Sequence, residues 1–207
     1  MINTYLSNKN KKETNELLVS LRRYANEHKV PIITFEGINF LNQIIRLKEA
    51  KRILEIGTAI AYSSINMVTS NDCYVTTIER DEKMYKEALK NIKSAGLEDK
   101  INVIFNDALE VDETNLGEFD LIFIDAAKAQ SIKFFEKYEK LLSSKGVIVT
   151  DNLVFHGLVI AEIKDRNLKQ LVRKIDTFND YVVSLEEYDT FIYPIGDGMS
   201  VSIKRKW

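Results

Sequence analysis

The chain has 207 residues, of which 45% are hydrophobic and 29% are charged, values typical of one globular domain. Its formal net charge of −2 excludes binding to nucleic acid through overall charge, so any such contact needs a local basic patch. No apolar run reaches the roughly 18 residues that cross a bilayer, so we expect a soluble protein. The single Cys73 excludes an internal disulfide, which agrees with the reducing cytoplasm. We expect one domain over residues 1–207.

Two amphipathic helices are predicted before residue 50. Apolar side chains recur at helical spacing at Leu17 and Leu21, after Thr14, a residue type that caps helix N-termini. The same period continues at Ile38 and Ile45. We therefore expect residues 1–50 to form a helical segment that belongs to the same domain as the rest of the chain.

From residue 52 onward, short runs of β-forming residues alternate with longer helical patterns. The strand candidates are residues 52–56, 74–78, 101–105, 119–124 and 147–150, and a helix over 81–95 stops at Gly96. Such alternation is typical of βαβ units that build a mainly parallel sheet. Near the end, residues 181–185 and 199–204 flank a turn with Pro194, Gly196 and Gly198. We predict an α/β fold whose sheet closes with an antiparallel pair.

The first predicted strand runs into a loop of small residues that begins at Gly57 and leads to a helix. Rossmann-like folds bind nucleotides at this place, because a glycine lets the backbone turn sharply and approach a ligand closely. Ser63 can cap the following helix or donate a hydrogen bond. Ala61 occupies the third small position, so the three-glycine dinucleotide pattern is missing, which argues against NAD.

Acidic residues follow the second and third strands at the same edge of the predicted sheet. Glu79 lies at about the 20-residue distance from the glycine loop at which an acid binds the ribose hydroxyls of an adenosine. Asp107 follows the third strand, where open α/β folds place their ligands. The alternatives are a solvated turn residue for Glu79 and a helix or turn cap for Asp107. The spacing from Gly57 favours a ligand-binding role for Glu79.

Three oxygen-bearing side chains follow the fourth and fifth strands, at Asp125, Asp151 and Asn152. If these strands are neighbours, two carboxylates and one amide form a hard ligand set that suits Mg²⁺ or Ca²⁺ better than zinc. A cation there could hold an acceptor hydroxyl and lower its pKa, which makes the oxygen nucleophilic. Lys128, three residues after Asp125, is a candidate general base, with a surface lysine at a helix start as the alternative.

Taken together, these segments resemble the cation-dependent O-methyltransferases, the family of the caffeoyl-CoA and catechol enzymes, over nearly the whole chain. The resemblance lies in Glu55-Ile56-Gly57-Thr58-Ala59 with Tyr62-Ser63-Ser64, in Ile78-Glu79-Arg80-Asp81, and in Asp125-Ala126-Ala127-Lys128 with Asp151-Asn152. It implies a metal-dependent methyltransferase that takes its methyl group from S-adenosylmethionine. It also implies a Rossmann-like, seven-stranded sheet with helices on both faces, and often a homodimer.

The resemblance assigns roles to individual residues as well. It implies contacts with S-adenosylmethionine at Ile33, Glu55, Gly57, Ser63, Glu79, Asp107, Ala108 and Asp125. It implies a divalent ion, for which Mg²⁺ is the natural choice, on Asp125, Asp151 and Asn152. Lys128 and Asp125 are then the catalytic residues.

Within the family, Lys128-Ala129-Gln130 with Phe134-Phe135, and the segment Arg173-Lys174-Ile175-Asp176, look closest to the bacterial tRNA 5-hydroxyuridine methyltransferases. This implies that the acceptor is a wobble uridine oxygen and the product 5-methoxyuridine. A tRNA acceptor requires a basic rim, for which Arg166 and Arg173 are the preferred candidates because they follow the metal loop along the chain. The alternatives are a small-molecule enzyme for catechol-like acceptors, which needs an apolar pocket, and a non-catalytic adenosine-binding module, which would have no use for a metal.

Overall fold

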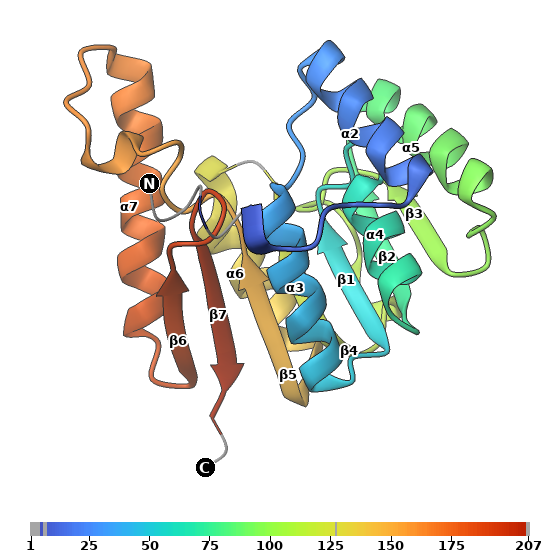
Figure 1. The fold of residues 1–207 in the computed structure, drawn as a ribbon. Coiled ribbons are helices and arrows are strands. Elements are labelled where there is room, and N and C mark those ends of the chain that lie inside the picture. The colour runs from blue at the N-terminus through green and yellow to red at the C-terminus, as the bar shows by residue number, and fades with distance from the viewer. Residues whose placement is uncertain (1–4, 6–7, 127, 206–207) are drawn as a thin grey trace.

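A computed structural model of the chain describes residues 5, 8–126 and 128–205; Ala127 of the acceptor motif lies outside these residues. Seven strands form one sheet in the order β3-β2-β1-β4-β5-β7-β6 (Figure 1). Strands β1 to β5 pair in parallel, and β7 is antiparallel to both β5 and β6. The strands are β1 (Arg52–Ile56), β2 (Tyr74–Glu79), β3 (Ile101–Phe105), β4 (Phe119–Ile124), β5 (Leu142–Thr150), β6 (Tyr188–Tyr193) and β7 (Met199–Lys204). The predicted Rossmann-like sheet with an antiparallel closing edge is confirmed.

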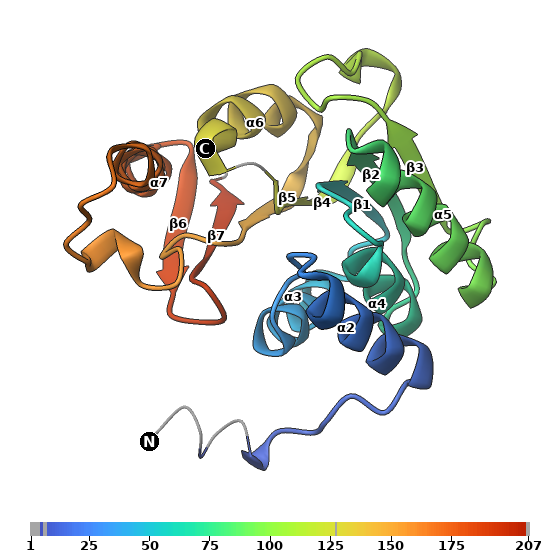
Figure 2. The same ribbon diagram turned by 90° about the horizontal axis from the view of Figure 1, so that it is seen from above.

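Helices cover both faces of this sheet because neighbouring strand residues point to opposite sides. Ile53 joins a core with α2, α3, α4 and α5, whereas Leu54 joins a second core with α6 and α7. Figure 2 shows α2, α3 and α4 on one side of the sheet and α6 and α7 on the other. In the described ranges, no helix has the length and apolar character needed to cross a membrane. The helices are α2 (Glu16–His28), α3 (Phe35–Lys48), α4 (Tyr62–Ser70), α5 (Glu82–Ala95), α6 (Ser131–Tyr138) and α7 (Arg166–Ser184).

Helix caps explain where the N-terminal helices begin, and they correct one prediction. Asn15, not Thr14, caps α2, and its side chain accepts a hydrogen bond from the Leu18 amide at 3.2 Å. Asparagine and threonine are both good capping residues, so the sequence alone did not separate the two neighbours. Thr34 caps α3 in the same way by accepting from the Gly37 amide at 3.0 Å.

The strand predicted at residues 181–185 is wrong. These residues include the last turn of α7, and the edge strand β6 begins only at Tyr188. Buried apolar residues recur through α7 at Ile175, Phe178 and Val182, which is a helical period. That long period outweighs the local β preference of the Tyr-Val-Val run. The second strand of the predicted pair, residues 199–204, is confirmed as β7.

Strands β2 and β3 lie on one side of β1, whereas β4 and β5 lie on its other side, so the strand order changes direction between β1 and β4. The loop after β1 lies at this point. Ligands of open α/β folds bind at such a switch point. Gly57 has a φ of +103°, and a Cβ at this residue would lie 2.2 Å from the carbonyl oxygen of Asp125. A side chain is therefore excluded by both conformation and space, so that the loop passes directly against the end of β4.

The substitution Gly57→Ala should destabilise the fold by more than about 3 kcal/mol, because it adds a steric clash with backbone to an unfavourable φ. Gly96→Ala is the matched control, since Gly96 also has a positive φ, +64°, but has no atom within 4 Å of the added Cβ. That control should cost only about 1 kcal/mol. Thermal unfolding measures both, and equal losses would contradict the close approach of Gly57 to Asp125.

Candidate active site

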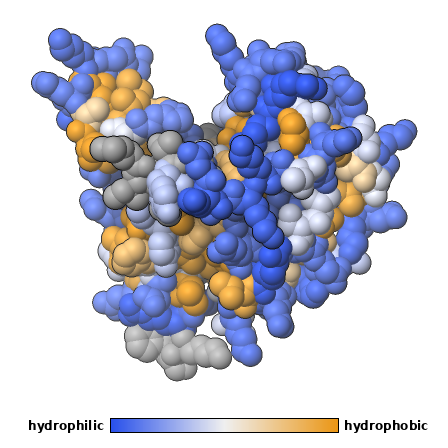
Figure 3. Space-filling view, in the orientation of Figure 1, coloured by the Kyte–Doolittle hydropathy of each residue, from blue (hydrophilic) through white to orange (hydrophobic). Residues whose placement is uncertain are grey.

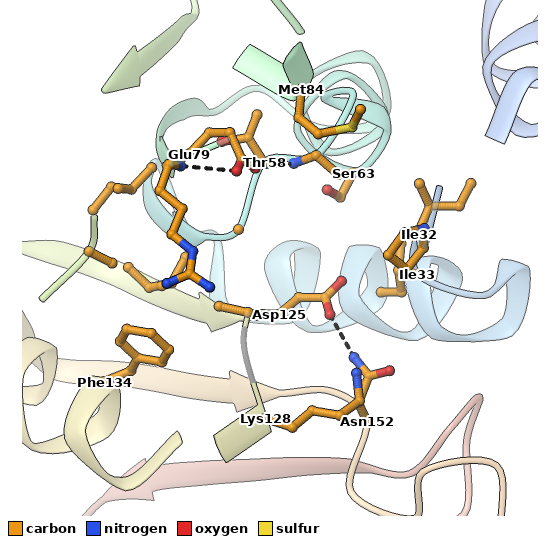
Figure 4. Close-up of a pocket in the computed structure, with 18 of the residues that line it drawn as sticks. Ile32, Ile33, Thr58, Ser63, Glu79, Met84, Asp125, Lys128, Phe134 and Asn152 are labelled. Atoms are coloured by element: carbon orange, nitrogen blue, oxygen red, sulfur yellow. Dashed lines mark hydrogen bonds between the residues drawn. The ribbon is translucent and has the colours of Figure 1, made fainter. Parts of the chain in front are cut away.

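A cavity of about 570 Å³ opens at the carboxyl edge of the sheet around the switch point. This volume lies in the range of small-molecule sites. Figure 4 shows Asp125 near the middle of the cavity, with Ser63 and Glu79 on one side and Lys128 and Asn152 on the other. Most of the predicted donor-binding residues line it together, namely Ile33, Gly57, Ser63, Glu79, Asp107, Ala108 and Asp125.

Backbone amides hold Glu79 in the cavity wall. One carboxylate oxygen accepts a hydrogen bond from the Ala59 amide at 2.8 Å, and the other accepts from the amides of Arg80 and Asp81. Because Ala59 belongs to the loop after β1, Glu79 joins this loop to the end of β2. Its carboxylate is thus fixed in position beside any ligand that enters.

Asp107 lies on the same wall, in the loop after β3. Its carboxylate accepts from the Leu109 amide at 2.9 Å and pairs with the Arg80 guanidinium at 3.1 Å. The Leu109 hydrogen bond is the main cause that lowers the pKa of Asp107, and Arg80 adds to it. The ionised form is favoured, which suits a hydrogen-bond acceptor for an adenosine.

Glu55 does not line the cavity, contrary to the contact implied by the family resemblance. Its side chain is fully buried beneath α4, where it accepts hydrogen bonds from Ser63 at 2.5 Å, from Ser64, and from Thr77 at 2.7 Å. Burial raises the pKa of Glu55 to about 7, although the three hydroxyls oppose that rise. Ser63 thus bonds to Glu55 instead of capping α4, whose N-cap is Ala61 with a φ of +63°. The alternation of strand side chains explains the placement of Glu55, because it points to the α4 side of β1.

The three candidate metal ligands lie together after β4 and β5. The Asn152 amide donates to Asp125 Oδ1 at 2.6 Å (Figure 4). The Asp151 carboxylate accepts from the Asn152 backbone N–H at 2.7 Å. Asn152 has a φ of +71°, in the left-handed region that non-glycine residues seldom adopt. Within residues 8–126 and 128–205, no three His, Cys, Asp or Glu side chains form a metal-type group, so a three-ligand set at this point would have to include the Asn152 amide.

Negative charge is concentrated at this point of the interior. Burial raises the pKa of both Asp125 and Asp151, and repulsion from Asp125 raises that of Asp151 further. The charge of Lys128 acts in the opposite direction on both carboxyls. Asp197, in the turn before β7, adds a third negative charge, and its buried Oδ2 has no hydrogen-bond partner in the described part of the chain. Lys128 thus offsets only part of the repulsion among these three carboxyl groups.

Several residues that line the cavity received no role in the site from the sequence. Tyr62, at the start of α4, and Phe134, on α6, stood in the quoted motifs without a role, whereas Phe155, three residues after Asn152, and Leu171, on α7, were not singled out. Lys128 Nζ lies over the Phe155 ring, 5.3 Å from its centroid. Apolar residues of this kind have no motif of their own, because only the packing of distant helices brings them to one cavity.

The predicted substrate residues Arg166 and Arg173 are exposed on α7 and do not line the cavity. Leu171 of the same helix does line it. The N-terminal end of helix α7 and the short 3-10 turn η4 (Leu158–Ile160) form an arm that projects above the sheet in Figure 1, whereas the rest of α7 packs beside β6. Apolar atoms gather on this arm in the space-filling view of Figure 3, and Ile160 is 93% exposed.

The fold and the cavity at its switch point define a Rossmann-like α/β protein with a nucleotide-type site. The sequence profile of the O-methyltransferase family matches residues 8–205. A caffeoyl-CoA O-methyltransferase from Populus kitakamiensis is 32% identical over 190 residues, which cover 87% of this chain and 80% of that protein. The chain therefore belongs to the family of S-adenosylmethionine-dependent O-methyltransferases of the caffeoyl-CoA type.

Solved structures agree with this family. A Staphylococcus aureus protein described as a caffeoyl-CoA O-methyltransferase superposes with a TM-score of 0.88 and 38% identity, over 99% of this chain and 97% of that one. An O-methyltransferase from Bacillus cereus in complex with SAH gives a TM-score of 0.82 and 26% identity, over 99% and 97% of the two chains. Both similarities extend over the cavity, because they cover almost the entire chain.

Replacing Glu55 by glutamine tests its burial through the pH dependence of stability. The native state holds a proton on Glu55 up to about pH 7, whereas the unfolded chain releases it near 4.5. The wild type should therefore lose roughly 3 kcal/mol of unfolding free energy through this group as the pH rises between these values. Glu55→Gln should lack that loss, as urea unfolding at pH 5 and pH 8 would measure. Parallel pH profiles of the two proteins would contradict a sealed carboxylate.

Proposed function

We propose that the protein binds S-adenosylmethionine in the cavity and transfers its methyl group to an acceptor hydroxyl beside Asp125, with the help of a divalent cation. One observation carries this proposal: Asp125 lines the donor cavity and is also hydrogen-bonded to Asn152, next to Asp151. Donor and acceptor sites that share one residue can hold the two reacting atoms close together, which is the main requirement of a transfer reaction.

The residues around Asp125 suit a hard divalent cation such as Mg²⁺. Asp125, Asp151 and Asn152 would hold it, since carboxylate and amide oxygens are its preferred ligands. Burial and mutual repulsion make it costly to ionise Asp125 and Asp151 together, and a bound cation would reduce that cost. When bound, the cation lowers the pKa of an acceptor hydroxyl and fixes its orientation.

Other side chains of the cavity position the reactants. Glu79 is placed to accept hydrogen bonds from the ribose hydroxyls of the donor, because its carboxylate is fixed by three backbone amides. Lys128 lines the cavity over Phe155, and we assign to its neutral amine form the acceptance of the proton that the acceptor hydroxyl loses. Phe134 and Phe155 provide apolar walls that exclude water from the reacting atoms.

For the acceptor, we propose 5-hydroxyuridine at the wobble position of tRNA, methylated to 5-methoxyuridine. Exposed cations on helix α7 beside the cavity support this proposal. Their angular positions around the helix, relative to the cavity residue Leu171, show which of them lie nearest to the cavity. Residues of an α-helix are about 100° apart, so Lys174 lies about 60° from the cavity residue Leu171, and Arg173 about 160°. Arg166, by the same measure, is about 140° away. Of these three cations, Lys174 is therefore the one best placed for phosphate near the cavity.

A small catechol-type acceptor is the second candidate. The caffeoyl-CoA relatives favour it, as does the apolar wall formed by Phe134, Phe155 and Leu171. An aromatic acceptor of this kind needs no contact with the outer part of α7. A homodimer and a cytoplasmic location stay predictions.

The variant Asp151→Ala separates donor binding from catalysis. Turnover should fall by at least about a hundredfold, whereas affinity for SAH should change less than about threefold, because Asp151 serves the cation and does not line the cavity. Chelation of divalent ions should have the same effect on the wild type. Asp189→Ala, at an exposed position of β6, is the matched control. Wild-type turnover in Asp151→Ala would refute the cation site.

The acceptor is tested by transfer of a labelled methyl group to tRNA that lacks the modification, in parallel with catechol. We expect label in tRNA, and Lys174→Glu should lower that rate roughly tenfold because it reverses a phosphate contact near the cavity. Arg173→Glu is the matched control on the outer side of the helix and should lower it less than about threefold. Labelling of catechol but not of tRNA would replace the first candidate by the second.

A further inference from the structure

The buried carboxylate of Glu55 is connected to the donor cavity through one hydroxyl group. Ser63, Ser64 and Thr77 all donate hydrogen bonds to it. Of these three, Ser63 is the one that lines the cavity. A ligand in the cavity can therefore compete with Glu55 for the Ser63 hydrogen, whereas the Ser64 and Thr77 bonds stay sealed in the core.

The start of α4 is suited to the anionic end of the donor. Its N-cap, Ala61, forms no side-chain cap, so the first amides of this nine-residue helix have no side-chain acceptor there. Tyr62 and Ser63, in the first turn, line the cavity. Uncapped helix N-termini attract carboxylates through their free N–H groups and the helix dipole. The α-carboxylate of the donor's methionine is its anionic group, and Glu79 holds the opposite, ribose end.

A hydroxyl has a single hydrogen, so Ser63 cannot donate to Glu55 and to a donor carboxylate at the same time. If Ser63 turned to the ligand while Glu55 stayed ionised, a buried carboxylate would lose one of its donors and face a second negative group. That state is costly in the interior. A proton on Glu55 removes the conflict, because the new O–H donates to Ser63 Oγ.

We propose that Glu55 is a positioning residue that takes up one proton from solvent when the donor binds, and thereby turns the Ser63 hydroxyl toward the donor's α-carboxylate. The inference rests on donor binding in the cavity, as proposed above. The relay runs from the Glu55 O–H to Ser63 Oγ, and from the Ser63 O–H to the ligand. No covalent bond changes other than the O–H bond formed on Glu55.

The surroundings of Glu55 favour this proton. Helix α4 offers Ser63 and Ser64, and β2 offers Thr77, all of them neutral. Among the described residues, Asp125 at the end of β4 is the charged group that acts on Glu55, and its negative charge also raises the pKa. Burial has already brought that pKa to about 7, so protonation near neutral pH requires little free energy.

Isothermal titration with S-adenosylhomocysteine tests the proposal, because this product has the same carboxylate without the reactive methyl group. At pH 8.5, titrations in phosphate and in Tris should differ in apparent enthalpy by an amount that corresponds to nearly one proton taken up. At pH 6, where Glu55 is already protonated, uptake should approach zero. The dissociation constant should rise up to tenfold per pH unit above about pH 7.

Three variants assign the proton to Glu55. Glu55→Gln carries a permanent N–H donor, so it should take up no proton and bind equally well at pH 6.5 and 8.5. Ser63→Ala should take up no proton and bind more weakly at both pH values. Ser64→Ala, the matched control, loses a bond to Glu55 but does not line the cavity, so it should keep the proton uptake.

The outcomes distinguish this inference from the proposed function. Binding by the wild type at pH 8.5 without proton uptake would overturn the relay and leave donor binding intact, as would proton uptake that persists in Glu55→Gln. Absence of binding at every pH would overturn the proposed function itself. If Glu55→Gln gives no cooperative thermal transition, the two-buffer titrations of the wild type and of Ser63→Ala still decide.

Discussion

Hydrogen bonds that continue the parallel sheet one residue beyond its strands hold the active site in place. The Asp125 amide donates to the carbonyl of Ile56 at 3.0 Å, and the Asp151 amide donates to that of Ile124 at 3.1 Å. The backbone of each acidic residue is thus fixed before its side chain meets any ligand. Gly57 lies directly against Asp125, so the donor loop and the candidate cation site share one rigid edge. Rigid support of this kind is what a transfer reaction between two bound molecules needs.

Three carboxyl groups that are costly to ionise lie close to this edge, and their surroundings differ. Glu55 is sealed under α4 among hydroxyls, so a proton is the species that can neutralise it. Asp125 opens to the cavity and lies next to Asp151, so a cation from solvent can reach the pair. The same burial therefore supports a proton at one position and, as we propose, a cation at the other. The charge of Lys128 lowers the pKa of Asp125 and Asp151, but both pKa values stay above the usual range of an aspartate.

The meeting of the acidic residues after the strands at one cavity could be predicted, because parallel strands end at a common edge. Glu79 and Asp107 follow different strands, yet both line the cavity with Gly57. Glu55 was assigned to the donor by resemblance alone. Its side chain points from β1 to the α4 side of the sheet and is buried beneath that helix. The misplaced edge strand has a related cause. A short β-branched run near Tyr181 looked like a strand, while the helical burial pattern extended through it.

The sequence by itself determined the βαβ order, the glycine at the switch point and the acidic residues after the strands, because these depend on local period and on chain order. Only the tertiary structure decided which side of α7 faces the cavity, so that Leu171 lines it while Arg166 and Arg173 do not. It also decided that Ser63 meets Glu55. Such contacts depend on how separate elements rotate and pack against one another. The free energy of that packing is spread over many residues, so no short motif contains it.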